Sequence, residues 1–215
     1  IALDQEGRLT KVFGGAIALR TAQIVNKELS MVQKKDLQTA EKQAIARYAA
    51  SLIERDDCVY LDAGTSTGWM IEYIREAQAT YVTNALSHAK RLADKGFHVI
   101  LIGGEPKSST DAIVGAEAVV NLQKYHFSKG FFGTNGVEQN GGFTTPDARE
   151  AMVKQTAVKN TQLANRYFLA TSSKFGEVYA VTFAGFEGGV ILTEAPVQES
   201  LPKSVRVVNV NQPEQ

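Results

Sequence analysis

The chain has little cysteine and no excess of charge of either sign. Its single cysteine, Cys58, among 215 residues excludes an intrachain disulfide and a multi-cysteine zinc site, and it is typical of a reducing cytoplasm. Lysine and arginine together number 23, as do aspartate and glutamate. The chain therefore lacks the net positive charge of a nucleic-acid-binding surface, and any anion that it binds must be bound at a local site.

Long hydrophobic runs and recognisable metal-ligand spacings are missing as well. No apolar stretch approaches the roughly 18 residues of a membrane span, and the N-terminal residues lack the pattern of a signal peptide. We therefore expect a soluble, cytoplasmic protein without membrane partners. The histidines, His88, His98 and His126, are not spaced as metal ligands. We expect them to be structural residues, at the surface or half-buried, and we expect no metal and no cofactor.

What the chain does contain is a regular alternation of short apolar runs and amphipathic segments. Strands are predicted over 58–61, 80–83, 97–102, 128–132, 166–170, 188–193 and 205–210. Helices are predicted over 36–54, 85–95, 111–122 and 147–164, with a further one after the loop 62–68. Strands that alternate with helices predict an α/β fold, in which a mostly parallel sheet carries helices on both faces.

The loop over 62–68 has the composition of a phosphate site. Gly64 allows the backbone to approach a ligand closely. The hydroxyls of Thr65, Ser66 and Thr67, together with the free N–H groups of a helix start, can donate hydrogen bonds to a phosphate. The loop has neither the lysine of a Walker A motif nor the GxGxxG fingerprint. An ordinary capped turn without a ligand is the alternative.

Other polar residues are predicted to gather near this loop. Ligands of parallel sheets bind beyond the carboxyl ends of the strands, so the loops over 62–68, 83–84, 103–110 and 133–146 should meet at one edge. Glu150 lies in the helix after the last of these loops. Lys174 follows another predicted strand and would supply the only positive charge at this edge, with a solvated surface lysine as the alternative.

Several short motifs follow one another along the chain. They are Leu61-Asp62-Ala63-Gly64-Thr65-Ser66-Thr67, Thr83-Asn84, Ile102-Gly103-Gly104, Gly133-Thr134-Asn135-Gly136 and Ser173-Lys174. Their order resembles the C-terminal effector domain of DeoR-family bacterial transcription repressors. The stretch from Leu9 to Ala16 is similar to the one that leaves the family's winged helix-turn-helix. The resemblance implies that residues 1–30 are a linker from a missing DNA-binding domain, that 31–215 form the effector domain, and that operator DNA is bound only through the missing part.

The family implies a fold similar to ribose-5-phosphate isomerase and glucosamine-6-phosphate deaminase, with a phosphosugar as the effector. The ligand-binding residues expected from the loops and the resemblance are Asp62, Gly64, Thr65, Ser66, Thr67, Thr83, Asn84, Gly103, Gly104, Asn135, Glu150 and Lys174. Compared with the isomerase, Asn135 replaces an aspartate and the segment 141–145 lacks the catalytic lysine. Thr171 stands before Ser-x-Lys, at a position where both families commonly have an aspartate.

Two functions stay open at this point. The first is an effector-sensing domain of a bacterial repressor of sugar metabolism, in which a phosphosugar alters DNA binding by the intact protein. The second is an aldose-ketose sugar-phosphate isomerase. The missing lysine favours the sensor. The run over 142–147 most resembles repressors of lactose or fructose phosphotransferase operons, which implies tagatose 6-phosphate or a fructose phosphate as effector. Paired DNA half-sites imply a homo-oligomer.

Overall fold

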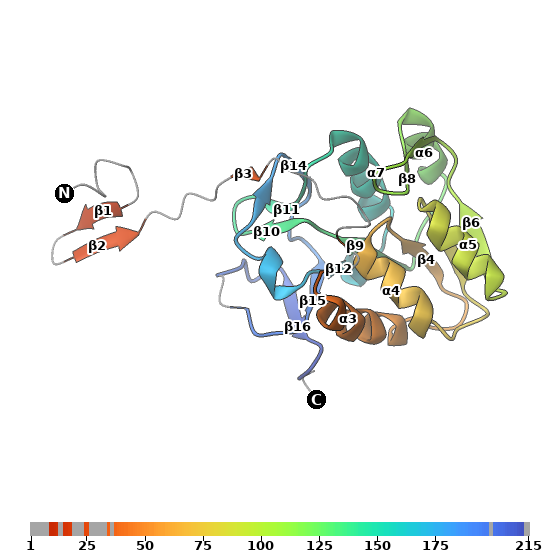
Figure 1. The fold of residues 1–215 in the computed structure, drawn as a ribbon, viewed down its shortest axis with the longest axis horizontal. Coiled ribbons are helices and arrows are strands. Elements are labelled where there is room, and N and C mark those ends of the chain that lie inside the picture. The colour runs from red at the N-terminus through yellow and green to blue at the C-terminus, as the bar shows by residue number, and fades with distance from the viewer. Residues whose placement is uncertain are drawn as a thin grey trace.

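The centre of the molecule is a sheet of seven strands, all parallel (Figure 1). The computed structural model describes residues 9–12, 15–18, 24–25, 34, 37–197 and 200–212. Across the sheet the strands are β16 (Arg206–Asn209), β15 (Gly189–Thr193), β12 (Arg166–Leu169), β9 (Lys129–Gly133), β4 (Cys58–Leu61), β5 (Thr80–Thr83) and β6 (His98–Leu101). The predicted parallel sheet is confirmed.

Helices cover both faces of this sheet, as the α/β pattern predicted. They are α3 (Thr39–Ser51), α4 (Thr65–Tyr73), α5 (Leu86–Asp94), α6 (Ala116–Leu122) and α7 (Ala148–Lys159), with short 3-10 turns η1 (Leu163–Asn165) and η2 (Ser172–Lys174). Successive strand residues point to opposite faces, and the core divides accordingly. Phe131 packs in one cluster with residues of α3, α4 and α5, whereas Phe132 packs in another with residues of α6 and α7.

A smaller antiparallel sheet packs beside α7. Its strands are β10 (Gly136–Glu138), β11 (Gly142–Thr145) and β14 (Val181–Ala184). The rings of Phe143 in β11 and Phe168 in β12 stack with 3.6 Å between their centroids. Both rings belong to the same buried cluster. The stack therefore joins the small sheet to the central one.

Three two-stranded pairs complete the structure. They are β1 (Leu9–Val12) with β2 (Gly15–Ala18), β7 (Glu105–Lys107) with β8 (Ala112–Val114), and β3 (Ile24–Val25) with β13 (Val178–Tyr179). The boundary predicted between residues 30 and 31 lies outside the described residues. The parallel pairing of β3 with β13 nevertheless shows that a strand on the N-terminal side of that boundary contacts the body of the domain.

The helix predicted over 111–122 is wrong in its first part. Residues Ala112–Val114 form strand β8 instead, and α6 begins only at Ala116. Asp111 and Gly115 on either side of this strand have φ angles of 57° and 95°. These left-handed conformations cannot continue a right-handed helix, so the apolar residues between them are extended. The helix predicted over 147–164 likewise ends earlier, at Lys159.

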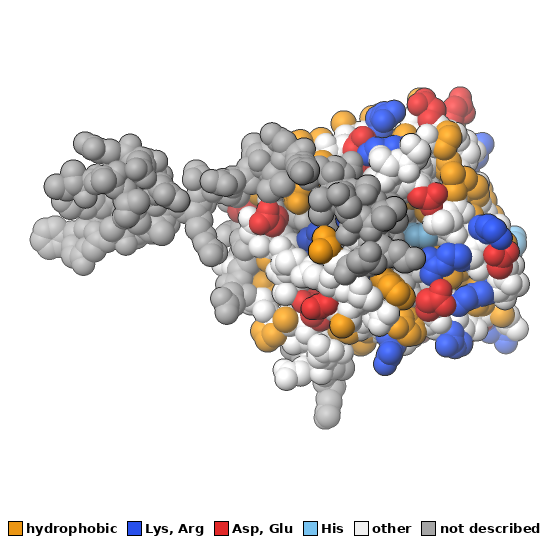
Figure 2. Space-filling model, in the orientation of Figure 1, with side chains coloured by type: hydrophobic (Ala, Val, Ile, Leu, Met, Phe, Trp, Pro, Cys, Tyr) orange, Lys and Arg blue, Asp and Glu red, His pale blue; other side chains and the backbone are white. Residues whose placement is uncertain are grey.

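The surface is mixed in charge. On the face that Figure 2 shows, lysine and arginine side chains are interspersed with aspartate and glutamate. None of the helices placed in the structure is both long and apolar enough to cross a bilayer. Within the described ranges, no group of three or more His, Cys, Asp or Glu side chains is arranged to hold a metal ion.

The Phe143–Phe168 stack gives a first prediction. We expect Phe143→Ala to lower the free energy of unfolding by about 3–5 kcal/mol, because it leaves a cavity where the small sheet meets the central one. Met152→Ala is the control, because Met152 lies on α7 with 54% of its surface exposed, and it should cost no more than about 0.5 kcal/mol. Urea denaturation measures both values. Equal losses in the two variants would contradict the structural role of the stack.

Candidate functional site

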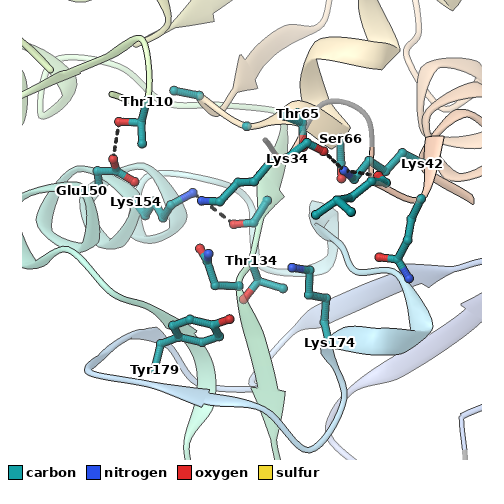
Figure 3. Close-up of a pocket in the computed structure, with 16 residues that line it drawn as sticks. Lys34, Lys42, Thr65, Ser66, Thr110, Thr134, Glu150, Lys154, Lys174 and Tyr179 are labelled. Carbon is teal, nitrogen blue, oxygen red and sulfur yellow. Dashed lines mark hydrogen bonds between the residues drawn. The ribbon is translucent and has the colours of Figure 1, made fainter. Parts of the chain in front are cut away.

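A cavity lies where β4, β9 and β12 end, in the middle of the central sheet. Its walls come from the loops after these strands, the first turns of α7, β13 and the entry to α3 (Figure 3). The predicted site residues that line it are Gly64, Thr65, Ser66, Asn135, Glu150 and Lys174. Lining residues that the sequence analysis did not name as site residues include Lys34, Gln38, Lys42, Thr110, Thr134, Lys154 and Tyr179.

The start of α4 forms one wall of the cavity. Gly64 is extended, and the helix runs from Thr65. The hydroxyl of Thr67 donates to the carbonyl of Asp62 at 2.6 Å and accepts from the N–H of Gly64 at 3.1 Å. Thr67 is fully buried and its hydroxyl shapes the loop, so a role of Thr67 in binding stays a prediction. Thr65 and Ser66 line the cavity, at a helix end whose first N–H groups have no acceptor within the helix.

Asp62 and Lys154, which lines the cavity, form a buried ion pair, with side chains 1% and 6% exposed. The same Oδ2 atom of Asp62 accepts from the N–H of Gly133 at 3.0 Å, and the ammonium of Lys154 donates to the carbonyl of Gly133 at 3.0 Å. The ammonium also lies 5.3 Å from the centre of the Phe183 ring. These contacts tie the loop after β4, the end of β9 and helix α7 together.

Glu150 is held on the opposite side of the cavity from η2, in the first turn of α7. Its Oε1 atom accepts from the ammonium of Lys107 at 2.9 Å and from the hydroxyl of Thr110 at 2.5 Å. Asp147 caps the helix by accepting from the N–H groups of Arg149 and Glu150, and its Oδ2 lies 3.0 Å from Lys107. Burial acts to raise the pKa of Asp147, but Lys107 and the N–H groups of Glu150 and Arg149 outweigh it and lower that pKa. The Glu150 carboxylate is thus fixed while it lines the cavity.

Lys174 reaches the cavity from η2 and is half-buried. Among the residues with described positions, none makes a hydrogen bond or an ion pair with its ammonium group. Burial and the nearby ammonium of Lys34 lower the pKa of Lys174, and together they outweigh the opposite effect of Glu177. A half-buried cation without a partner is a place where an anion would be stabilised.

The remaining predicted residues lie away from the cavity wall. Asn84 is 2% exposed, and its amide bonds to the hydroxyl of Tyr60, the N–H of Ala63 and the carbonyl of Ile113. Thr83 is fully buried, and its hydroxyl accepts from the N–H of Ala85. At Gly104 a Cβ atom would meet the carbonyl of Val114 at 2.7 Å. Gly103 lies beside it. These residues support the loops around the site, and a role in binding stays a prediction for them.

Comparison with known proteins now identifies the family. A family model described as the DeoR C terminal sensor domain matches residues 37–192, which is most of the chain. The chain belongs to the DeoR sensor-domain family. The match begins just before α3 and ends in β15, so it contains the three strands whose ends form the cavity.

Relatives of this DeoR sensor domain are transcription regulators. The chain is 42% identical over 192 residues to an uncharacterized HTH-type transcriptional regulator, FruR, of Bacillus subtilis (strain 168), covering 89% of this chain and 74% of that protein. It is 39% identical over 180 residues to the lactose phosphotransferase system repressor of Staphylococcus aureus (strain N315), covering 82% of this chain and 70% of that protein.

Solved structures align with this chain less closely. A ribose 5 phosphate isomerase A from Neisseria gonorrhoeae aligns with a TM-score of 0.45 and 11% identity, over 62% of this chain and 52% of that one. The eIF2B delta protein from Chaetomium thermophilum aligns with a TM-score of 0.47 and 15% identity, over 73% and 59%. Alignments at this level do not indicate what the DeoR sensor domain does.

The prediction that Lys174 supplies the only positive charge is wrong. Lys34, Lys42 and Lys154 line the cavity as well, so the absence of lysine from 141–145 does not leave it without ammonium groups. Lys154 stands four residues after Glu150 on α7. That spacing places both side chains on one helical face, and it is a signal that the sequence contained.

His88 corrects the expectation of surface or half-buried histidines. It lies in α5 with 1% of its surface exposed, and its Nδ1 atom has no hydrogen-bond partner. His98 and His126 are exposed. Burial, followed by the charge of Arg91, lowers the pKa of His88 from its usual value near 6.5 to about 4. His88 is therefore neutral in the folded DeoR sensor domain above about pH 4.

This lowered pKa predicts a loss of stability in acid. Between about pH 6.5 and pH 4 the unfolded chain binds a proton at His88 that the folded chain does not bind. The free energy of unfolding should therefore fall over this window, by up to about 3 kcal/mol from this residue. Urea denaturation at several pH values measures it. His88→Asn should remove that part of the slope, whereas the exposed control His126→Asn should keep it. Parallel slopes in His88→Asn and the unsubstituted chain would contradict the assignment.

Proposed function

We propose that this chain is the effector-sensing part of a transcriptional repressor of sugar metabolism, and that its cavity binds a phosphosugar. The observation that carries the proposal is the ammonium of Lys174, half-buried, without a partner among the described residues, and facing the start of α4 across the cavity. Among the described lining residues, four are lysines and one, Glu150, is acidic. Even with Lys154 paired to Asp62, the lysines outnumber the acidic residue, and this surplus suits a ligand with a phosphate dianion.

The phosphate is assigned to the end of the cavity near Lys174. There the hydroxyls of Thr65 and Ser66 and the first N–H groups of α4 supply donors, and the positive end of the helix dipole favours an anion. Charge-assisted hydrogen bonds from a lysine are stronger than those between neutral groups. An unphosphorylated sugar would leave these donors and the ammonium of Lys174 without an anion.

The sugar is assigned to the end of the cavity near Glu150. Oε1 of Glu150 is already occupied by Lys107 and Thr110, so its second oxygen is the one proposed to accept from a sugar hydroxyl. Oδ1 of Asn135 accepts from the hydroxyl of Thr145 at 3.3 Å, which leaves its amide nitrogen to donate. A carboxylate and an amide that line the same cavity match the donor and acceptor character of sugar hydroxyls.

The relatives suggest which sugar is bound. One is described as a lactose phosphotransferase system repressor, and the run over 142–147 resembles such repressors. Tagatose 6-phosphate or a fructose phosphate is therefore the proposed effector. In this proposal residues 1–30 link the sensor to a DNA-binding domain. The protein works in the cytoplasm as a homo-oligomer, and phosphosugar binding changes its affinity for operator DNA.

Thermal unfolding with a panel of sugars tests the ligand class. Tagatose 6-phosphate, fructose 1-phosphate and fructose 6-phosphate are compared with the free sugars and with inorganic phosphate. At a hundredfold excess over Kd, a ligand adds about 2.7 kcal/mol, which corresponds to about 5–10 °C in Tm for a chain of this length. We expect such a shift with at least one sugar phosphate and none with its free sugar.

Equal shifts with a sugar and its phosphate would contradict the assignment of the phosphate end. The same samples can be assayed for aldose-ketose interconversion, for which we expect no activity above the uncatalysed rate. Turnover that is lost in Glu150→Gln would favour the isomerase instead of the sensor.

A lysine substitution tests the residue on which the proposal rests. We expect Lys174→Met to weaken binding of the stabilising sugar phosphate by about ten- to a hundredfold, because a charge-assisted hydrogen bond is lost. Calorimetric titration measures Kd. Without ligand, stability should change by no more than about 0.5 kcal/mol. Lys124→Met is the matched control, since Lys124 is exposed near the end of α6. An unchanged Kd in Lys174→Met would overturn the role of this residue.

A further inference from the structure

The residues that lead into α3 form part of the cavity wall. Lys34, Leu37 and Gln38, here called the entry residues, all line it, although α3 itself begins at Thr39 and packs on one face of the sheet. Figure 3 shows Lys34 and Lys174 extending into the same space from different parts of the chain. The entry residues therefore form part of the cavity wall, together with residues from later parts of the chain.

The described contacts that hold the entry residues are polar. Oε1 of Gln38 accepts from the hydroxyl of Thr171 at 3.0 Å and from that of Ser173 at 2.9 Å. Both partners lie at η2, which also carries Lys174. Lys42 donates to the carbonyls of Leu37, at 2.6 Å, and of Lys34. Leu37 is 50% exposed, so little apolar burial adds to these bonds.

Electrostatics makes these contacts sensitive to what fills the cavity. Lys34 and Lys174 carry like charges close enough for Lys34 to lower the pKa of Lys174. Two ammonium groups that extend into one cavity repel each other. An anion between them replaces this repulsion with attraction to both. When an anion occupies the cavity, the electrostatic force on Lys34 thus changes from repulsion by Lys174 to attraction by the anion.

A second attachment of the N-terminal part lies at the same cavity. Strand β3 pairs with β13, and Tyr179 of β13 lines the cavity. The N–H of Tyr179 donates to the hydroxyl of Thr144 in β11 at 3.0 Å. Both described attachments of residues that precede α3 therefore involve the cavity wall.

We propose that Lys34 is the residue through which the site reports its occupancy: a phosphosugar held between Lys34 and Lys174 fixes the entry residues against η2. The inference rests on the proposed function, because it needs an anion in this cavity. It adds that the signal leaves the site through the start of α3 and not through the helices on the other face of the sheet. By linkage, loosening the entry residues must also weaken ligand binding.

Hydrogen exchange of the 215-residue chain, read by mass spectrometry, tests the proposal. The probe is the sugar phosphate that gives the largest thermal shift, at a saturating concentration for each variant. We expect peptides covering residues 37–45 to exchange at least about fivefold more slowly with ligand. Lys34→Gln should still bind, with a higher Kd, and should lose this protection while keeping that of residues 64–70. Lys124→Gln, an equal change of charge at an exposed site, should behave like the unsubstituted chain.

A second variant tests the hydrogen bonds between Gln38 and the residues at η2. Gln38→Ala removes the acceptor of Thr171 and Ser173, so exchange over 37–45 should be faster both with and without ligand, and Kd should rise.

The outcomes separate the two proposals. If no sugar phosphate shifts the Tm of the unsubstituted chain, the proposed function fails and this inference fails with it. If a sugar phosphate binds and protects residues 64–70 but not 37–45, only the inference is overturned. Full protection of 37–45 in Lys34→Gln would also overturn it, because the signal would then not depend on this ammonium group.

Discussion

The buried ion pair between Asp62 and Lys154 is the contact on which the geometry of the site depends. It joins the loop after β4 to α7, and both partners also bond to Gly133 at the end of β9. Removing one member of such a pair leaves an uncompensated buried charge, which typically costs about 3–5 kcal/mol. The loops after β4 and β9 and helix α7 are therefore held in a fixed relation before any ligand arrives, which reduces the ordering cost of binding.

This pair also determines where the cavity is positive. Because Asp62 neutralises Lys154, the ammonium that stays without a partner among the described residues is that of Lys174, on the far side. Glu150 is matched by Lys107 and held by the cap at Asp147. The cavity thus has a cationic end at η2 and an acidic end at α7. This polarity orients a ligand that carries an anionic group at one end and hydroxyls at the other, and it disfavours the reverse orientation.

The strands of the fold can be predicted from the sequence more readily than the residues of the site. Runs such as Cys58–Leu61 are buried on both faces of a parallel sheet, so apolar composition alone marks them. The same composition is misleading at Ala112–Val114, where the left-handed residues on either side decide the outcome. Lys154 was visible in principle, from its spacing to Glu150. Lys34 was not, since its distance along the chain from Lys174 gives no local pattern, and only the fold brings the two together.

The topology explains why the start of α3 and the cavity lie at the same edge of the sheet. In a right-handed crossover, a helix on a parallel sheet runs antiparallel to the strands, so each helix begins at the edge where the strands end. Ligands bind at that same edge. Helix α3 precedes β4 and obeys this rule, which brings Gln38 to the cavity. If α3 ran in the opposite direction, its 13 residues would place the residues that precede it about 20 Å from the cavity, at about 1.5 Å per residue. The residues that lead into α3 therefore lie at the edge of the sheet where the cavity opens.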